Sequence, residues 1–257
     1  MQLDQGFPFA FLITLAAGLS TGVGSVIGLL SKGFNPRLLS LALSFSAGVM
    51  IFVSFVEIFP KARLAMAAAF GAQLGYGAAL LAFFVGIGLM ALIDALLPQR
   101  QLWPDAHQGL LRTGLFTALA IGIHNFPEGL ATFVGAIAKP RLGLSIALAI
   151  AIHNIPEGLA ISAPIYAATG NRRLAFLLSF ASGLAEPLGA LVGYGLLRQV
   201  FNDVVFGLVF AGVAGIMVYI CFDELLPAAA RSHGAAQVMA GVVAGMAVMG
   251  LSLVLLS

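Results

Sequence analysis

The feature that most constrains this chain is a series of apolar runs, each long enough to cross a membrane as a helix. A spanning helix needs about 20 residues, and charges, prolines and glycine clusters mark where a run ends. Eight runs can be read, at residues 7–30, 38–59, 76–97, 113–138, 142–167, 174–197, 204–226 and 235–256. We therefore predict an all-α polytopic membrane protein of eight transmembrane helices, with residues 1–257 forming a single transmembrane domain.

The composition agrees with a membrane protein and excludes several other classes. Of the 257 residues, 61% are apolar and 9% are charged, whereas a soluble domain is about 25% charged. No basic run interleaves with aromatic residues, so we expect no nucleic acid partner. Cys221 is the single cysteine, which excludes an internal disulfide and a metal cage built from several cysteines.

The basic residues of the predicted loops indicate the orientation. If both termini lie outside, the inner loops hold seven Lys and Arg residues and the outer loops hold five. An excess of basic residues in the inner loops is typical of membrane proteins. We therefore predict that both termini lie outside.

Several acidic residues lie in or at the ends of the predicted spans, whereas the basic residues fall in the predicted loops or at helix ends. These acidic residues include Glu57, Glu128, Glu157, Glu186, Asp223 and Glu224. A carboxylate near the bilayer centre is costly unless it is paired, and such residues usually mark ion pathways. Because no fixed cation is expected beside them, the counter-charge must be mobile: a proton on each carboxyl group, or a bound metal ion.

A hexapeptide occurs twice, in two consecutive predicted spans. The fourth span reads HNFPEG from His124 to Gly129, and the fifth reads HNIPEG from His153 to Gly158. On a helix, residues i and i+4 share a face and residue i+3 lies beside them, so the His, Asn and Glu of each copy gather together. Two imidazoles and two carboxylates suit a borderline divalent metal such as zinc.

The hexapeptides predict two adjacent metal sites that share two glutamates. The more zinc-like site would use His124, Glu128, His153 and Glu157, and the more permissive one would add Asn125 and Asn154 to both glutamates. Glu186, about halfway along the sixth span, is a third intramembrane ligand. The alternatives are carboxyl groups that stay protonated in an apolar bundle, and polar side chains that hydrogen-bond between helices.

Prolines accompany each of these acidic residues. Pro127 and Pro156 precede the motif glutamates and Pro187 follows Glu186. A proline removes one helical hydrogen bond, so we expect kinked or broken helices at the site, as transporters use around bound ions.

Eight spans with HNFPEG in the fourth and HNIPEG in the fifth resemble the ZIP metal transporters. The strings FVEIFPKA, SGLAEPLG and AGIMVYICFDELLP are similar to those of bacterial members, and the likeness covers nearly the whole chain. The resemblance implies import of zinc, iron(II), manganese and other divalent ions across the bacterial inner (cytoplasmic) membrane, with periplasmic termini. Zinc would then be a transported substrate, and no prosthetic group is expected.

The resemblance also implies a two-metal centre built by the fourth, fifth and sixth spans. By motif position, the first ion would be held by His124, Glu128, His153 and Glu157. The second would be held by Asn125, Glu128, Asn154, Glu157 and Glu186. The loop before the fourth span is often His-rich in the family, but residues 98–112 contain only His107, so a high-capacity metal-receiving loop is not expected. His107 is a candidate entry or exit residue.

A further similarity suggests an inverted repeat. The string FVEIFP at the end of the second span is echoed by FDELLP at the end of the seventh, and inverted repeats are common in carriers. In a 3+2+3 bundle, Glu57 would guard the outer mouth, and Asp223 and Glu224 the inner mouth. The alternative is that these acidic residues cap helix ends at the headgroups.

We expect a carrier that alternates access, and no enzyme. An intramembrane metalloprotease would use His-Glu-x-x-His with the Glu as general base, whereas here Asn follows each His. The residues are also compatible with a proton channel, or with a bundle that holds a structural metal. Glycines spaced by four, such as Gly24 and Gly28, could support a homodimer or close contacts inside one bundle.

Overall fold

The computed structural model describes residues 3–30, 36–96, 106–197, 200, 202–230 and 234–256. Within these residues the regular secondary structure is helical, with no strand. Seven helical stretches of the described chain are long and apolar enough to cross a membrane. The 33-residue helix α5 (Ala106–Ala138) adds another long helix. The predicted all-α, multi-spanning fold is confirmed.

The helices follow the predicted order of spans. The first four spans are α1 (Leu3–Leu30), α2 (Pro36–Val53) continued by η1 (Ser54–Ile58) and α3 (Phe59–Phe70), α4 (Ala72–Leu96), and α5. The last four are α6 (Pro140–Thr169), α7 (Arg172–Gly183) with α8 (Ala185–Leu197), α9 (Asp203–Ile220) continued by η2 (Cys221–Leu225) and α10 (Leu226–Ala230), and α11 (Ala235–Leu256).

The predicted end of the second span at residue 59 is wrong. The helix continues past Pro60 to Phe70, where Gly71, with φ of 80°, turns the chain into α4. Lys61 and Arg63, expected in an outer loop, therefore lie on a helix. Pro60 stands directly after a change in the helical hydrogen bonds, since the N–H of Phe59 bonds the carbonyl oxygen of Ser54, five residues earlier. A π-helical turn, η1, precedes it.

The seventh span departs from prediction in the same way. It runs from Asp203 through Pro227 to Ala230, and the π-helical turn η2 precedes the proline. The two similar strings FVEIFP and FDELLP therefore share one backbone feature: a five-residue π-helical turn followed by a helix with proline in its first turn. Arg112, also expected in a loop, lies on α5.

The expected helix breaks do not occur at Pro127 and Pro156. Both α5 and α6 stay helical through these prolines. The interruption lies instead at Leu184, between α7 and α8 and two residues before Glu186. Neighbouring helices can hold a proline-containing helix in one piece in a membrane bundle.

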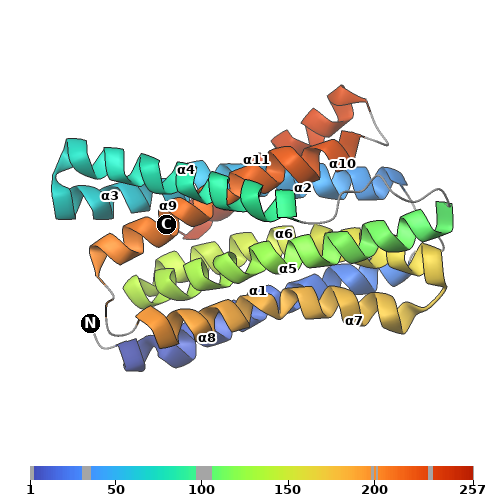
Figure 1. Ribbon diagram of the computed structural model, residues 1–257, viewed down its shortest axis with the longest axis horizontal. Helices are drawn as coiled ribbons and strands as arrows, with labels where there is room; N and C mark the ends of the chain where they lie inside the picture. The colour runs from blue at the N-terminus through green and yellow to red at the C-terminus, as the bar shows by residue number, and fades with distance from the viewer. Residues whose placement is uncertain are drawn as a thin grey trace.

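The helices form two groups (Figure 1). The motif group consists of α1, α5, α6, α7 and α8, and the flanking group consists of α2 with η1 and α3, α4, α9 with η2 and α10, and α11. In Figure 1 the motif group lies below and the flanking group above, with α6 between them. The groups meet chiefly where α2 packs against α6, with smaller contacts of α5 with α9 and of α6 with α11.

Close glycine contacts show the inverted repeat. A Cβ atom added to Gly48 of α2 would lie 2.1 Å from the carbonyl oxygen of Val242 in α11. A Cβ atom added to Gly215 of α9 would lie 2.0 Å from the carbonyl oxygen of Phe83 in α4. The pair α2 and α11 thus packs as the pair α9 and α4 does, and glycine permits the approach because it has no side chain.

The motif group repeats its contacts in the same manner. A Cβ atom on Gly24 of α1 would lie 1.8 Å from the carbonyl oxygen of Ile155 in α6, and one on Gly189 of α8 would lie 2.1 Å from that of Phe126 in α5. A second repeated contact in the motif group pairs Gly129 and Glu186 with Gly158 and Thr21. The flanking group has one as well, which pairs Gly86 and Gly212 with Gly245 and Phe45. The repeat exchanges α5 with α6, which are consecutive antiparallel helices, so its two-fold axis is perpendicular to them.

These glycines are used inside the bundle. Among the glycines of the described residues, each close backbone approach between helices joins members of the same group. Gly24, Gly189 and Gly245 therefore build the intramolecular packing, and the homodimer stays a prediction without support from them.

Replacing Gly86 by alanine tests the packing of the flanking group. A Cβ atom at Gly86 would lie 2.0 Å from the carbonyl oxygen of Gly212, whereas one at Gly88, on the same helix, has no described atom within 4 Å. We expect Gly86→Ala to lower the free energy of unfolding by about 1–3 kcal/mol, measured by thermal unfolding in detergent. Gly88→Ala is the matched control, and equal stability of both variants would contradict the packing.

Candidate metal centre

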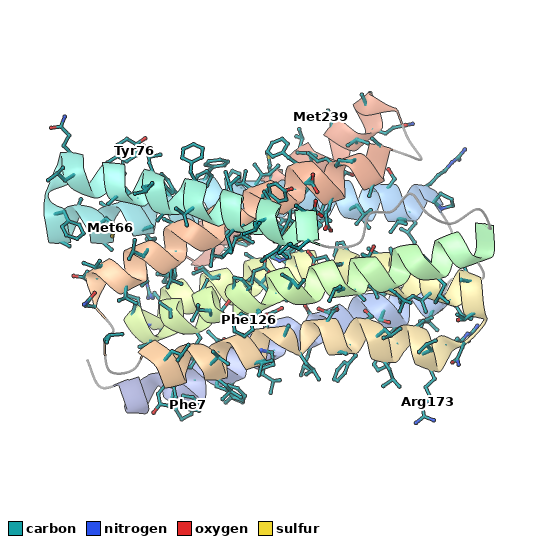
Figure 2. All side chains as sticks on the ribbon, viewed as in Figure 1. Phe7, Met66, Tyr76, Phe126, Arg173 and Met239 are labelled. Carbon is teal, nitrogen blue, oxygen red and sulfur yellow. The ribbon has the colours of Figure 1, made fainter. Side chains whose placement is uncertain are left out.

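Helices α5, α6 and α8 bring the two hexapeptides and Glu186 together in the middle of the motif group. Phe126, inside the first hexapeptide, lies near the middle of the bundle, whereas Arg173 lies toward one end (Figure 2). Gly129 and Gly158 follow the motif glutamates. Gly129 lets α8 approach α5 closely, and Gly158 lets α1 approach α6, so α8 and α1 pack against the two motif helices at the centre. The backbone positions of both hexapeptides therefore face a tightly packed interior.

The polar residues of the centre are buried. Those with no exposed surface are Asn125, Glu128, His153, Asn154, Glu157 and Glu186. Burying a carboxylate is costly unless it is paired or binds a cation. Three carboxyl groups and one imidazole without solvent access therefore need compensation inside the protein.

One contact joins the two hexapeptides directly. Nε2 of His153, on α6, lies 3.3 Å from Oε2 of Glu128, on α5. Nδ2 of Asn154 donates to the carbonyl oxygen of Ala17 at 3.0 Å, and also to Oε1 of Glu186. The predicted ligands Glu128, His153, Asn154 and Glu186 are thus linked in two pairs.

Asn125, on α5, is the counterpart of Asn154 in the inverted repeat. Its Nδ2 donates to the carbonyl oxygen of Ser182, on α7, at 3.3 Å. His124 also lies on α5, but its side chain is outside the described residues. Among the described side chains, no three His, Cys, Asp or Glu residues are already arranged around one ion position.

Several buried oxygen atoms of the centre are free to bind a cation. Oδ1 of Asn125, Oδ1 of Asn154 and Oε2 of Glu186 accept no hydrogen bond from any described residue. A buried acceptor without a donor is costly, and a divalent cation would compensate three such oxygens at once. With the imidazole of His153, the donors are nitrogen and oxygen, which suits zinc and similar divalent ions.

The predicted mouth residues lie in the two π-helical turns. Glu57, in η1, pairs with Lys61 at 3.7 Å. Asp223 and Glu224 lie in η2. Their roles as gates stay predictions, as does any role of His107, which lies near the start of α5 and whose side chain is outside the described residues.

Two features near these sites were missed by the sequence interpretation. The hydroxyl of Ser46, on α2, donates to the carbonyl oxygen of His153 at 3.3 Å, which ties the flanking group to the motif. Asp94 lies on α4, two residues before the end of that helix. A serine in an apolar span does not by itself indicate a functional role. Asp94, an acidic residue near the end of the third predicted span, could have been noticed from the sequence.

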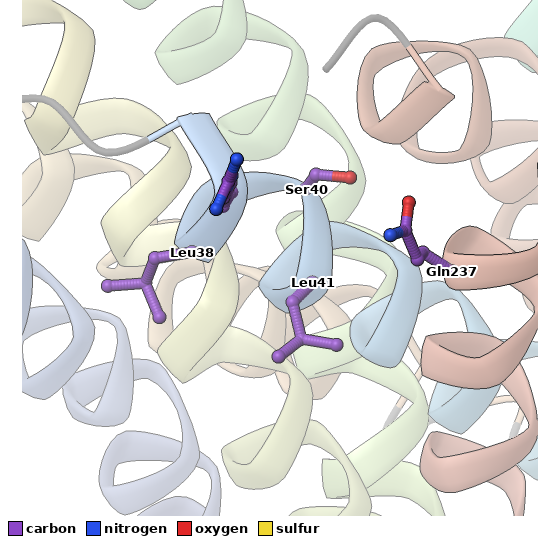
Figure 3. A pocket seen from close by; sticks show the side chains of 5 residues that line it. Leu38, Ser40, Leu41 and Gln237 are labelled. Carbon is purple, nitrogen blue, oxygen red and sulfur yellow. The ribbon is translucent and has the colours of Figure 1, made fainter. Parts of the chain in front are cut away.

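A pocket of about 290 Å³ lies away from these residues (Figure 3). It opens between the starts of α2 and α11 and is lined by Arg37, Leu38, Ser40, Leu41 and Gln237. It contains no motif residue, and the hydroxyl of Ser40 is bonded to the carbonyl oxygen of Ala229 at 2.6 Å. The lining of this pocket therefore brings together none of the predicted metal ligands.

Comparison with known proteins identifies the family. A family model described as ZIP Zinc transporter matches residues 103–253. The chain belongs to the ZIP family. It is 56% identical over 260 residues to the zinc transporter ZupT of Chlorobium chlorochromatii, covering 96% of this chain and 97% of the relative. It is 56% identical over 268 residues to that of Lysinibacillus sphaericus, covering 99% and 100%.

Family membership agrees with the structure and with the predicted class. The matched segment contains both hexapeptides and Glu186. The relatives are named as transporters and not as enzymes. This ZIP chain is therefore a multi-pass membrane protein of a transporter family, as the apolar runs and the resemblance carried by the hexapeptides predicted.

Binding of zinc should stabilise the protein through the buried glutamates. A ligand that binds only the folded state raises the free energy of unfolding by about 2.7 kcal/mol when its concentration is 100 times its Kd. We expect zinc to raise the Tm of the unaltered protein in detergent but not that of the Glu128→Gln, Glu157→Gln variant. Glu57→Gln is the control outside the centre and should keep the response. An equal rise in all three proteins would place the binding elsewhere.

Proposed function

We propose that this protein imports zinc, together with iron(II), manganese and other divalent ions, into the cytoplasm through a two-metal centre in the middle of the membrane. The observation that carries the proposal is the buried set of nitrogen and oxygen donors on α5, α6 and α8, joined by the contact of His153 with Glu128. The names of the relatives support zinc as the substrate.

The proposed ligands follow the two layers of the hexapeptides. The first ion is held by His124, Glu128, His153 and Glu157. The second is held by Asn125, Glu128, Asn154, Glu157 and Glu186. Both glutamates of the hexapeptides bridge the ions, so loss of one glutamate weakens both sites.

The division into two groups supports transport by alternating access. All proposed ligands lie on the motif group, whereas the flanking group approaches the centre through side chains such as Ser46. Close backbone contacts at glycines fix the helices within each group. The motif group therefore moves against the flanking group as a unit and carries the ions from one face to the other.

The basic residues support a placement of the protein in its membrane. The protein lies in the bacterial inner membrane with periplasmic termini, as the excess of basic residues in the predicted inner loops suggests. The whole chain acts as one transport domain. Glu57 guards the periplasmic mouth, and Asp223 and Glu224 guard the cytoplasmic one. Homodimerisation is open to a mass measurement in detergent.

Uptake of radioactive zinc into proteoliposomes tests the function. The unaltered protein should give saturable uptake, and the His124→Ala, His153→Ala variant should lose most of it because two nitrogen ligands are removed. Ser145→Ala, on α6, is the control, since among the described residues that hydroxyl bonds its own helix, at the carbonyl oxygen of Arg141.

Other outcomes would identify a different protein. Flux that does not saturate indicates a channel, and zinc that is retained without exchange indicates a structural metal. Hydrolysis of a peptide or lipid without zinc movement indicates an enzyme. Each of these results would overturn the proposed carrier.

A further inference from the structure

The inverted repeat assigns a symmetry mate to every proposed ligand of the second ion. The exchange of α5 with α6 pairs Asn125 with Asn154 and Glu128 with Glu157, which are chemically identical mates. The exchange of α1 with α7 and α8 pairs a further ligand, Glu186, with a residue on α1. The glycine contacts identify this residue as Thr21.

Three independent contacts support the pairing of Thr21 with Glu186. The carbonyl oxygen of Thr21 faces Gly158, as that of Glu186 faces Gly129. A Cβ atom on Gly18 would lie 3.3 Å from Cβ of Glu186, and one on Gly183 would lie 3.0 Å from Cβ of Thr21. In the same register, Asn154 donates to the carbonyl oxygen of Ala17 and Asn125 to that of Ser182.

The side chain of Thr21 is buried and its hydroxyl has no described partner. Thr21 has no exposed surface, and no described residue exchanges a hydrogen bond with its Oγ1. Asn154 donates a hydrogen bond to Glu186. The repeat pairs Asn154 with Asn125 and Glu186 with Thr21, so Thr21 is the counterpart of Glu186 beside Asn125. Oδ1 of Asn125 likewise accepts no hydrogen bond from the described residues. The repeat therefore assigns two oxygens without a described hydrogen bond, on Thr21 and Asn125, to the side of the centre opposite Glu186.

We propose that the Thr21 hydroxyl is an oxygen ligand of the second metal ion, in the place that Glu186 occupies on the other side. The inference rests on the proposed two-metal centre and adds to it a ligand from α1. A neutral hydroxyl at this position leaves the centre with three carboxylates, Glu128, Glu157 and Glu186. A fourth carboxylate would hold two divalent ions more tightly, so threonine favours release of the second ion.

The test measures zinc binding to the purified full-length protein by titration calorimetry and by metal analysis. Thr21→Ala should weaken binding of the second zinc ion roughly tenfold, the lower end for a lost group beside a metal, and leave the first ion in place. Thr21→Ser should bind both ions as the unaltered protein does. Thr14→Ala is the matched control, because Thr14 is also buried on α1 but its hydroxyl bonds the carbonyl oxygen of Ala10 at 2.8 Å.

An exchange of the two mates gives the sharper test. Glu186→Thr alone should lose the second ion, and adding Thr21→Glu should restore it. Gly183 faces Thr21 as Gly18 faces Glu186, so the exchange keeps a glycine opposite each of the two positions. A structural role of Thr21 in packing predicts no such rescue.

The outcomes separate this inference from the proposed function. If the unaltered protein binds no zinc, the two-metal centre itself is wrong. If it binds two ions and Thr21→Ala binds them equally well, only the role of Thr21 is wrong. Should the exchanged variant fail to purify, the contrast between Thr21→Ala and Thr21→Ser still decides.

Discussion

Burial of three carboxyl groups among apolar helices is the constraint on which the rest of the structure depends. Glu128, Glu157 and Glu186 have no exposed surface, and an uncompensated charge at such a position costs several kcal/mol or more. The imidazole of His153 contacts Glu128 and the amide of Asn154 donates to Glu186. Oδ1 of Asn125, Oδ1 of Asn154 and Oε2 of Glu186 accept no hydrogen bond from the described residues. Buried oxygens that accept no hydrogen bond from the protein are suited to bind a cation. A cation held by such oxygens does not have to displace hydrogen-bond donors of the protein when it binds.

The glycines explain how so polar a centre is held without rigidifying the whole bundle. They bring the backbones together within the motif group and within the flanking group, so each group is tightly packed. Between the groups, the contacts of α2 with α6 include side-chain bonds such as that of Ser46. Side-chain contacts can be exchanged more easily than interlocked backbones, so the proposed movement of the motif group would take place at the plane between the two groups.

Much of this could be predicted from the sequence, and the failures have physical reasons. Long apolar runs and a duplicated hexapeptide located the spans and the candidate ligands, because membrane crossing and metal binding each demand particular residue types at fixed spacing. Prolines misled the interpretation: Pro60 and Pro227 follow π-helical turns that a residue pattern does not reveal, and Pro127 and Pro156 are held in continuous helices. Thr21 was missed although Gly18, Gly24 and Gly28 match Gly183, Gly189 and Gly193 in spacing. The strings that suggested the repeat lie in the second and seventh spans, and the register of the first span against the sixth came from their contacts.

X-ray absorption at the zinc edge of the zinc-loaded protein tests the central claim most directly. If a cation is the counter-charge of the buried glutamates, the first shell contains only nitrogen and oxygen at about 2.0–2.2 Å, with imidazole scattering that Glu128→Gln, Glu157→Gln abolishes together with the bound zinc. Sulfur at about 2.3 Å from Cys221, or an unchanged spectrum in that variant, would contradict the account.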